Sequence, residues 1–417
     1  LIAMFGSIAL AIIALNYVGG MEVLLSKLNQ LLGTGVVTEN TLKFIPPIPD
    51  AAIGTQTFWE SPFSKFLIFT TIMWWSHHGT DGGGYIIQRM SSAKNERHAL
   101  LATLWFNLAH YALRVWPWII VAVVSIVMFP IIPSEYSELG VKAGYPLVMN
   151  TLLGPGLKGI LIVSFLAAFM STIDTHLNWG VSYLINDIYR RFFKPNESER
   201  HYVFIGKIMT VILMVLAAFT ALKMQSISKA WEFIFSMGAG IGLVLILRWF
   251  WWRVNAWSEI TALATSIIIT ITLEFVAYFQ TIDNDLPYSL FAASPTIFGV
   301  QLQIHHKLMI IVPIAIIAWV SVTFLSNPEP IDKLEEFYKR VQPGGWWDPV
   351  TSNFKHTLQP VTKGIFILWV SGVLMIYGFT FGIGNLIFQN YGAAVILFGC
   401  AGLGSYLIWN KSISKLT

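Results

Sequence analysis

The stretch that decides the fold is SFLAAFMSTIDTHLNWGVSYLINDIYRR, which runs from Ser164 to Arg191. It begins as an apolar helix of membrane-spanning character and ends in a basic pair, yet polar side chains crowd its middle. A polar group in lipid hydrocarbon costs several kcal/mol unless it finds a partner or faces a cavity. The polar side chains in question are Ser171, Thr172, Asp174, Thr175, His176 and Asn178.

Three neighbouring positions of this stretch share one helix face. Ala168, Ser171 and Thr172 are spaced i, i+3, i+4. Two hydroxyls and a freed backbone carbonyl offer only oxygen ligands, which suit a hard cation and not zinc or copper. Ser and Thr also hold helices together in membranes, so a helix contact is the competing interpretation. Asp174 on the same side favours the ion site.

Composition independently indicates a membrane protein that crosses the bilayer many times. Of 417 residues, 55% are hydrophobic and 12% charged, whereas soluble domains carry about 25% charged residues. The 17 Trp fit the aromatic belts at membrane surfaces. The single cysteine, Cys400, excludes a disulfide framework and a cysteine-based metal site. We therefore expect an all-α, polytopic protein.

About ten segments are long and apolar enough to cross a bilayer, at roughly 20 residues each. They lie at 1–20, 64–88, 98–129, 156–188, 202–223, 228–252, 258–281, 305–325, 362–385 and 390–410. Basic residues gather after the second, fourth, sixth and eighth segments, for example Arg97, Arg191, Arg253 and Lys333. By the positive-inside rule, both ends of this chain are cytoplasmic.

The second segment, MWWSHHGTDGGGYIIQR (73–89), is interrupted by glycine. Three consecutive glycines should unwind a helix, and in a membrane irregular backbone survives only where it is buried or lines a cavity. Transporters bind substrate and ions at such interruptions. Alternatively, the glycines end the helix at the surface, because Arg89 follows closely.

Two histidines and an acid flank these glycines and raise the question of a metal site. His77 and His78 point in different directions on a helix, and no established ligand spacing completes the set with Asp81. We expect contacts with substrate or with a gate instead.

The third segment carries Arg114 at a depth where a charge must face the bundle interior. Asp174 is the obvious internal acid, so we expect an ion pair between them, which serves either coupling or structure alone.

The motifs AAFMSTIDTHLN (167–178) and NDIYRRF (186–192) together resemble the sodium:solute symporter family, which includes the sodium–glucose cotransporters. The resemblance implies an inverted-repeat, leucine-transporter-like fold. It also implies a Na⁺ site made by the carbonyl of Ala168 and the hydroxyls of Ser171 and Thr172. Asp174 matches an acidic position found in many members.

Tyr85-Ile86-Ile87-Gln88-Arg89, followed by Ser92-Ala93-Lys94, is similar to another motif of this family. Tyr85 then matches an aromatic gate beneath the substrate. Sugar-transporting members carry amides where Gly83 and Gly84 stand, so sugar specificity is not implied. The expected substrate or gate residues are Trp75, His78, Asp81, Gly83, Gly84 and Tyr85. The string RWFWWRVNAWSE (248–259) resembles a bacterial branch, which implies a bacterial inner membrane.

On this resemblance the chain divides into four parts. Residues 1–20 form the last helix of a first repeat, 21–63 an extracellular loop, 64–254 a second repeat with the ion and substrate site, and 255–417 accessory helices. The family's first broken helix has no counterpart here. We therefore expect further N-terminal helices, in the same or a separate polypeptide.

These expectations converge on a sodium-coupled symporter of a small organic solute that works by alternating access. Its partners are the solute, sodium and the lipid bilayer, and no nucleic acid is expected. A receptor or sensor that binds solute on the same fold without transporting it is the alternative. An enzyme is not expected, because no nucleophile–base pair or metal constellation is evident.

Overall fold

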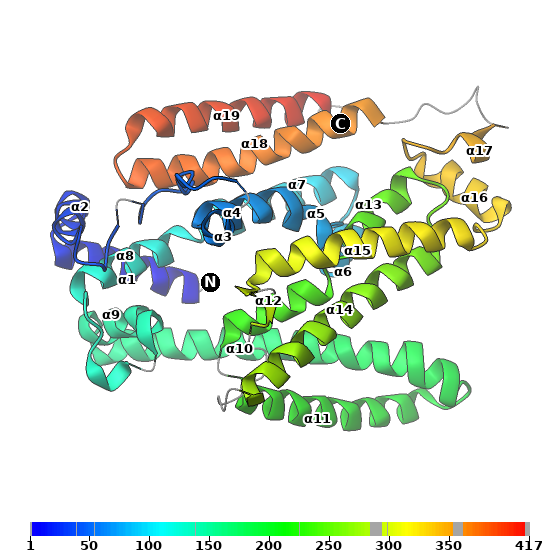
Figure 1. Cartoon of the computed structure of the whole chain (residues 1–417), viewed down its shortest axis with the longest axis horizontal. Coiled ribbons are helices and arrows are strands. Elements are labelled where there is room, and N and C mark those ends of the chain that lie inside the picture. Colours follow the sequence, from blue (N-terminus) through cyan, green and yellow to red (C-terminus); the bar gives the residue numbers. More distant parts are fainter. Residues whose placement is uncertain are drawn as a thin grey trace. The chain divides into compact units, whose positions relative to one another are not determined.

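The computed structural model describes residues 2–412 except 39, 54, 138, 225, 284–293, 298 and 353–361. The side chains of Tyr85, Asp283, Thr362 and Lys363 also lie outside this description. The described chain is mainly helical (Figure 1), and β1 (Thr296–Ile297) and β2 (Val300–Gln301) form a short antiparallel ribbon. The expected all-α, polytopic architecture is confirmed.

Within the described residues, eight helices are long and apolar enough to cross a membrane, or nine if one bent pair counts as a span. They lie at 96–128, 155–193, 199–223, 227–250, 256–282, 304–325, 364–387 and 391–411. The ten or so expected segments include two that are not long single helices. Residues 1–20 end in a sharp bend, and residues 64–88 are broken.

The chain forms two compact units, each assembled from three stretches of sequence. Residues 1–42, 106–222 and 376–401 make the first unit, and 43–105, 223–375 and 402–417 make the second. The long helices α18 (Thr362–Ile387) and α19 (Tyr391–Lys411) contribute residues to both.

The first unit packs around one apolar core at α1 (Ile2–Val18), where Leu10 and Ala14 are fully buried. Its other helices are α2 (Met21–Gln30), η2 (Leu108–Leu113), α8 (Trp116–Met128), η3 (Ser134–Tyr136), η4 (Gly140–Ala143), α9 (Gly144–Leu152), α10 (Pro155–Tyr183), η5 (Leu184–Phe193) and α11 (Glu199–Lys223). Of these, η2 and η5 are π-helical, so their turns are wider than those of an α-helix.

A glycine pair bends the chain between α1 and α2 by 65°. Gly19 and Gly20 have φ of 103° and 94°, which side chains other than glycine rarely adopt. The segment expected to be a loop from residue 21 therefore begins with a helix. Leu24 and Leu28, one turn apart, are buried there and hold α2 against the core.

The longest helix of this unit, α10, runs through η5 and turns back as α11 to form a helical hairpin (Figure 1). Val181, Ile185 and Tyr202 pack together near the turn. The polar stretch from Ser171 to Asn178 lies towards the C-terminal half of α10.

The second unit contains two helices that are interrupted, one between α5 and α6 and one between α12 and α13. Its elements are α3 (Gln56–Glu60), α4 (Pro62–Ile68), η1 (Phe69–Met73), α5 (Trp74–Ser76), α6 (Gly83–Ser91), α7 (Glu96–Asn107), α12 (Ile227–Met237), α13 (Gly242–Phe250), α14 (Ala256–Asp283), α15 (Ile304–Leu325), α16 (Ile331–Val341) and α17 (Asp348–Thr351). α14 and α15 pack against each other along their length, and both contact α12.

The expected break in the second segment is confirmed. The helix ends at Ser76, the chain is irregular from 77 to 82, and α6 begins at Gly83. Gly82 and Gly83 have φ of 91° and 66°, which explains why glycine stands at both positions.

A second break follows α12, although the sequence predicts only one glycine-interrupted helix. Residues 238–241 leave the helix before α13 starts at Gly242. The two breaks are in direct contact: a Cβ at Gly242 would strike the carbonyl oxygens of Trp75 and His77, and one at Gly238 would lie 2.6 Å from Nδ1 of His78. At Gly242 the obstacles are backbone atoms, so only glycine permits this approach.

We predict that Gly242→Ala destabilises the protein, because the methyl group has no space beside the Trp75 carbonyl. Overpacking of this kind costs about 1–3 kcal/mol. Gly372→Ala in α18 is the matched control, because no atom lies within 4 Å of the added methyl group. Alanine inside a helix should gain about 0.5–1 kcal/mol there. Thermal unfolding of the two purified variants should show shifts of opposite sign, and equal shifts would contradict the close contact.

Candidate functional site

Asp81 organises the break between α5 and α6. Its Oδ1 accepts a hydrogen bond of 2.9 Å from the Gly83 backbone N–H at the start of α6. Its Oδ2 lies 2.9 Å from Nη2 of Arg248 in α13, and the Asp81 side chain is only 14% exposed. One carboxylate thus shapes the first interrupted helix and ties it to the second.

Arg248 also reaches a second acid. Its Nη1 lies 3.6 Å from Oε2 of Glu259 in the first turn of α14. The guanidinium therefore has one strong and one longer carboxylate partner, contributed by different elements. With both acids ionised, the two carboxylates outnumber the single base, and the group as a whole is negative.

The irregular segment between α5 and α6 satisfies much of its own backbone. The Thr80 hydroxyl donates to the His77 carbonyl at 2.6 Å, and the Gly82 N–H donates to the Gly79 carbonyl. The Gly79 N–H donates to Nδ1 of His77. The Trp75 indole N–H donates to the Thr71 carbonyl in π-helix η1, so Trp75 turns back along its own helix.

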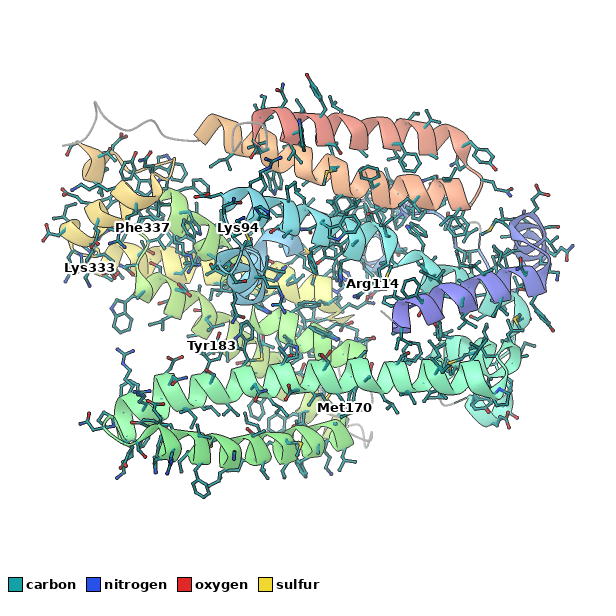
Figure 2. All side chains as sticks on the ribbon, turned by 180° about the vertical axis from the view of Figure 1, so that it is seen from behind. Lys94, Arg114, Met170, Tyr183, Lys333 and Phe337 are labelled. Atoms are coloured by element: carbon teal, nitrogen blue, oxygen red, sulfur yellow. The ribbon has the colours of Figure 1, made fainter. Side chains whose placement is uncertain are left out.

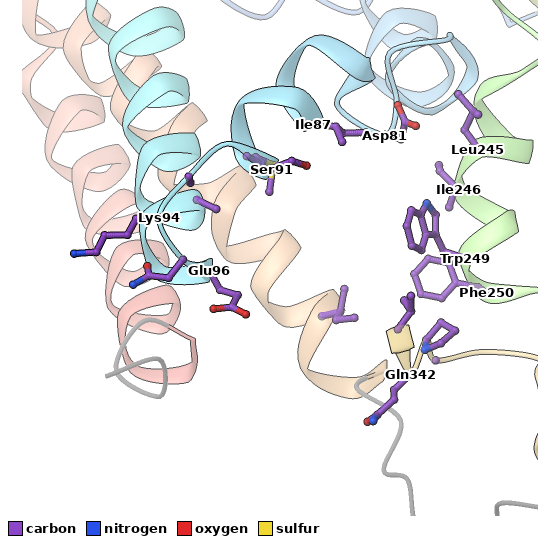
Figure 3. Close-up of a pocket in the computed structure, with 18 residues that line it drawn as sticks. Asp81, Ile87, Ser91, Lys94, Glu96, Leu245, Ile246, Trp249, Phe250 and Gln342 are labelled. Carbon is purple, nitrogen blue, oxygen red and sulfur yellow. The ribbon is translucent and has the colours of Figure 1, made fainter. Parts of the chain in front are cut away.

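A cavity of about 1040 Å³ lies beside this break. Figure 3 shows Asp81 and Ile87 near Leu245, Ile246, Trp249 and Phe250 of α13, with Lys94 and Glu96 on the far side. Residues 341–344 and Ile365 also contribute to the lining. The wall is mainly apolar with a few polar groups, as small-molecule sites in proteins usually are.

Of the substrate or gate residues expected from the sequence, Asp81 lines this cavity. Gly83 and Gly84 begin α6, and His78 lies against Gly238 of the second break. The side chain of Tyr85 lies outside the described residues, so its role as a gate stays a prediction.

The expected ion-binding residues lie on α10. Ala168, Ser171 and Thr172 are exposed, and the Thr172 hydroxyl donates to the Ala168 carbonyl at 3.0 Å. This is the ordinary hydrogen bond of a helical threonine to the carbonyl four residues earlier, so it does not by itself indicate an ion site. Met170 and Tyr183, labelled in Figure 2, bracket this polar stretch on α10. These residues belong to the first unit, whereas the Asp81 site belongs to the second.

The structure does not bring Arg114 and Asp174 together. The Arg114 guanidinium lies 5.1 Å from the Trp118 ring centroid, and Asp174 accepts a hydrogen bond of 3.1 Å from Asn178. Each side chain contacts a neighbour one turn away on its own helix, where proximity is automatic. No ion pair joins Arg114 to Asp174 among the described residues.

Sequence reasoning missed the charged groups that the second unit does pair. Besides Arg248 with Asp81, Lys307 of α15 lies 3.3 Å from Glu274 of α14, with side chains 7% and 12% exposed. The available signal was a charge inside an apolar span, which calls for an internal partner. By this criterion Arg248 and Lys307 need an internal acid just as Arg114 does, but the criterion does not predict which acid each one binds.

The expectation that His77, His78 and Asp81 form no metal site stays a prediction for the part of the chain that the structure describes. There, no group of three or more His, Cys, Asp or Glu is arranged to hold a metal ion. His77 and His78 lie with their ring centroids 5.8 Å apart and nearly perpendicular planes, so the two rings face different directions.

Comparison with known proteins identifies a family that matches more than half of the chain. Residues 1–268 match the sodium:solute symporter family. The chain is 28% identical over 169 residues to the osmoregulated proline transporter of Bacillus subtilis, covering 37% of this chain and 34% of the relative. It is 26% identical over 306 residues to a sodium/mannose cotransporter of Bos taurus, covering 66% and 49%. A sodium/proline symporter of Haemophilus influenzae is 35% identical over 107 residues, covering 25% and 21%. The matched chain thus spans half or less of the length of these relatives.

We predict strong coupling between Asp81 and Arg248. Asp81→Asn or Arg248→Gln alone leaves a partly buried charge without its partner and should cost about 1–3 kcal/mol. The double variant should cost less than the sum, with a coupling energy of about 0.5–3 kcal/mol by thermal unfolding.

The control cycle uses Glu336 and Arg340, which pair at 2.6 Å on the exposed face of α16. Exposed pairs of this spacing couple by only about 0.3–0.5 kcal/mol. If the Asp81–Arg248 effects are as additive as those of the control, the ion pair does not tie the two breaks together.

Proposed function

The chain belongs to the sodium:solute symporter family, and on that premise we propose that it carries the ion and solute sites of a sodium-coupled symporter. The transported molecule is a small organic solute, and transport proceeds by alternating access. The relatives named above are proline and mannose transporters, so a small polar solute of comparable size is the proposed class.

The observation that carries this proposal is the contact between two interrupted helices beside a cavity. In a bilayer, irregular backbone is tolerated only where protein covers it or a cavity receives it. Transporters place their substrate and ion sites at such discontinuities. Here Gly242 and Gly238 of one break lie against the other, and Asp81 joins them at the cavity wall.

The proposed sodium ligands are the Ala168 carbonyl and the hydroxyls of Ser171 and Thr172. All are neutral oxygens on one face of α10. A hard monovalent cation favours this donor set over nitrogen or sulfur. Binding at this face must differ between the outward and inward states if sodium is to drive the cycle.

The same proposal covers placement in the cell. The protein lies in the cell membrane with both ends of this chain in the cytoplasm, because basic residues follow alternate spans. Lys94 lines the cavity from one such basic loop, so the cavity opens towards the cytoplasm. We also propose that residues 64–254 form the second repeat. The first repeat then requires further N-terminal helices, in the same or a separate polypeptide.

The test is uptake by the full-length protein reconstituted into proteoliposomes. An inward sodium gradient should drive accumulation of a labelled solute selected by thermal stabilisation of the purified protein, and a sodium ionophore should abolish it. Replacing sodium by potassium is the control. Sodium-dependent binding without accumulation would contradict transport and favour a receptor.

We predict that Ser171→Ala/Thr172→Ala raises the sodium requirement. The double variant removes two oxygens from a site of about five or six ligands. The sodium concentration for half-maximal uptake should rise by about 10–100-fold, with little change in the rate at saturating sodium.

Thr220→Ala in α11 is the matched control. This exposed threonine makes the same kind of bond, donating to the Leu216 carbonyl at 2.8 Å. Its loss should leave sodium dependence unchanged. A wild-type sodium dependence in the double variant would show that the ion binds elsewhere.

A further inference from the structure

α13 is a short helix between a turn, which interrupts the 227–250 span without a sharp bend, and a non-helical connection. Residues 238–241 precede it, and residues 251–255 separate it from α14. It supplies Leu245, Ile246, Trp249 and Phe250 to one wall of the cavity. A half-helix jointed at both ends can change its direction without losing its own hydrogen bonds, so it suits a moving wall.

Val244 and Leu245 of α13 are buried in one apolar cluster with Ala262 and Trp319. Three further attachments hold α13 in the position seen here. At its start, Gly242 packs on the carbonyls of Trp75 and His77. Beyond its end, the Trp346 N–H donates to the Phe250 carbonyl at 2.6 Å, and the Trp347 indole N–H donates to the Trp249 carbonyl at 3.0 Å. Between them, Arg248 binds Asp81 across the cavity edge.

These attachments differ in how easily they can be exchanged. The first is close packing of backbone, which is lost when the helices separate at all. The ion pair is directional and partly open to solvent, since the Arg248 side chain is 36% exposed. A guanidinium has five donors in a planar fork and can hold one carboxylate while it approaches another.

Glu259 supplies that second carboxylate at 3.6 Å, from the helix that follows the C-terminal joint. Breaking an ion pair inside a protein is costly when a charge is left alone. An arginine that always keeps one acid is never left alone, and Asp81 keeps the hydrogen bond from the Gly83 N–H when Arg248 leaves it. The two arrangements can then lie close in free energy, which a cycling protein requires.

We propose that the Asp81–Arg248 ion pair is a latch that opens once in each transport cycle, when Arg248 passes from Asp81 to Glu259 and α13 moves away from the α5–α6 break. This inference rests on the proposed function and adds a named positioning residue to it. Arg248 acts through the position of α13 and touches no transported atom.

The first test locks the latch. Cys400 is the single cysteine of these 417 residues, so Cys400→Ser, with any cysteine elsewhere in the full-length protein also replaced by Ser, gives a background free of other thiols. In it, Asp81→Cys/Arg248→Cys is joined by a reducible bifunctional methanethiosulfonate reagent. Sodium-driven uptake should fall by about tenfold or more relative to the same variant before joining, and reduction should restore it. Recovery on reduction shows that the protein is folded throughout.

The reagent control is Glu336→Cys/Arg340→Cys on α16, where the two positions belong to one helix and α13 is not restrained. Joining this pair should leave uptake unchanged. If joining residues 81 and 248 has as little effect as this control, the latch does not open during transport and the proposal is overturned.

The second test reads the position of α13 without transport. Ile246 lines the cavity from α13, so Ile246→Cys in the Cys400→Ser background reports its exposure through the rate of thiol labelling. Arg248→Gln releases the latch and should raise this rate by about tenfold, whereas Arg248→Lys should stay near the parent. Glu259→Gln removes the alternative partner and should lower the rate.

Opposite signs for Arg248→Gln and Glu259→Gln are the diagnostic result. A merely structural ion-pair cluster would loosen in both variants, so a rise in both overturns the proposal. Because labelling needs neither sodium nor solute, this readout stays informative if the protein proves not to transport.

Discussion

Backbone polar groups that leave a helix need other partners, and residues 77–82 leave the helix between two helical segments. The local solution uses side chains: Thr80 donates to the His77 carbonyl, and Asp81 accepts from the Gly83 N–H. A second chain break packs against this segment through glycines, with Gly242 close to the carbonyls of Trp75 and His77. The position of Asp81, the placement of Arg248 and the shape of the cavity all depend on this contact.

The first break was predictable because three consecutive glycines between apolar stretches strongly disfavour a continuous helix. The helix that carries Ala168, Ser171 and Thr172 was predictable from its apolar length, whereas their role as ion ligands stays a prediction, since residues 166–176 are exposed on every side of α10. The second break was not, because Gly238, Gly240 and Gly242 fit close helix packing equally well. They serve both purposes here: Gly240 lies against Ser266 and Ala315, while Gly238 and Gly242 meet the first break.

Charge pairing was the part that the sequence could not assign. Sign and depth require that a buried base find an acid, but they do not say which one. Arg114 lies over the ring of Trp118, while Arg248 binds Asp81 from 167 positions earlier in the chain. Lys307 and Glu274 meet across α14 and α15, whose packing brings together residues that no local pattern relates. Such pairs depend on tertiary structure, which periodicity does not encode.

The π-helical turns at η1, η2 and η5 have a consequence for aligning this chain with its relatives. A widened turn accommodates an extra residue in about the same length of helix, and each residue of an ordinary helix turns by about 100°. Side chains beyond the widened turn therefore point to a different side of the span. Asn107 and Arg114 flank η2, so their relative direction cannot be counted at 3.6 residues per turn. A relative that lacks the widened turn aligns with this chain only if a one-residue gap is placed inside the helix. Without that gap, Arg114 is aligned with a residue that does not occupy the equivalent position in the relative.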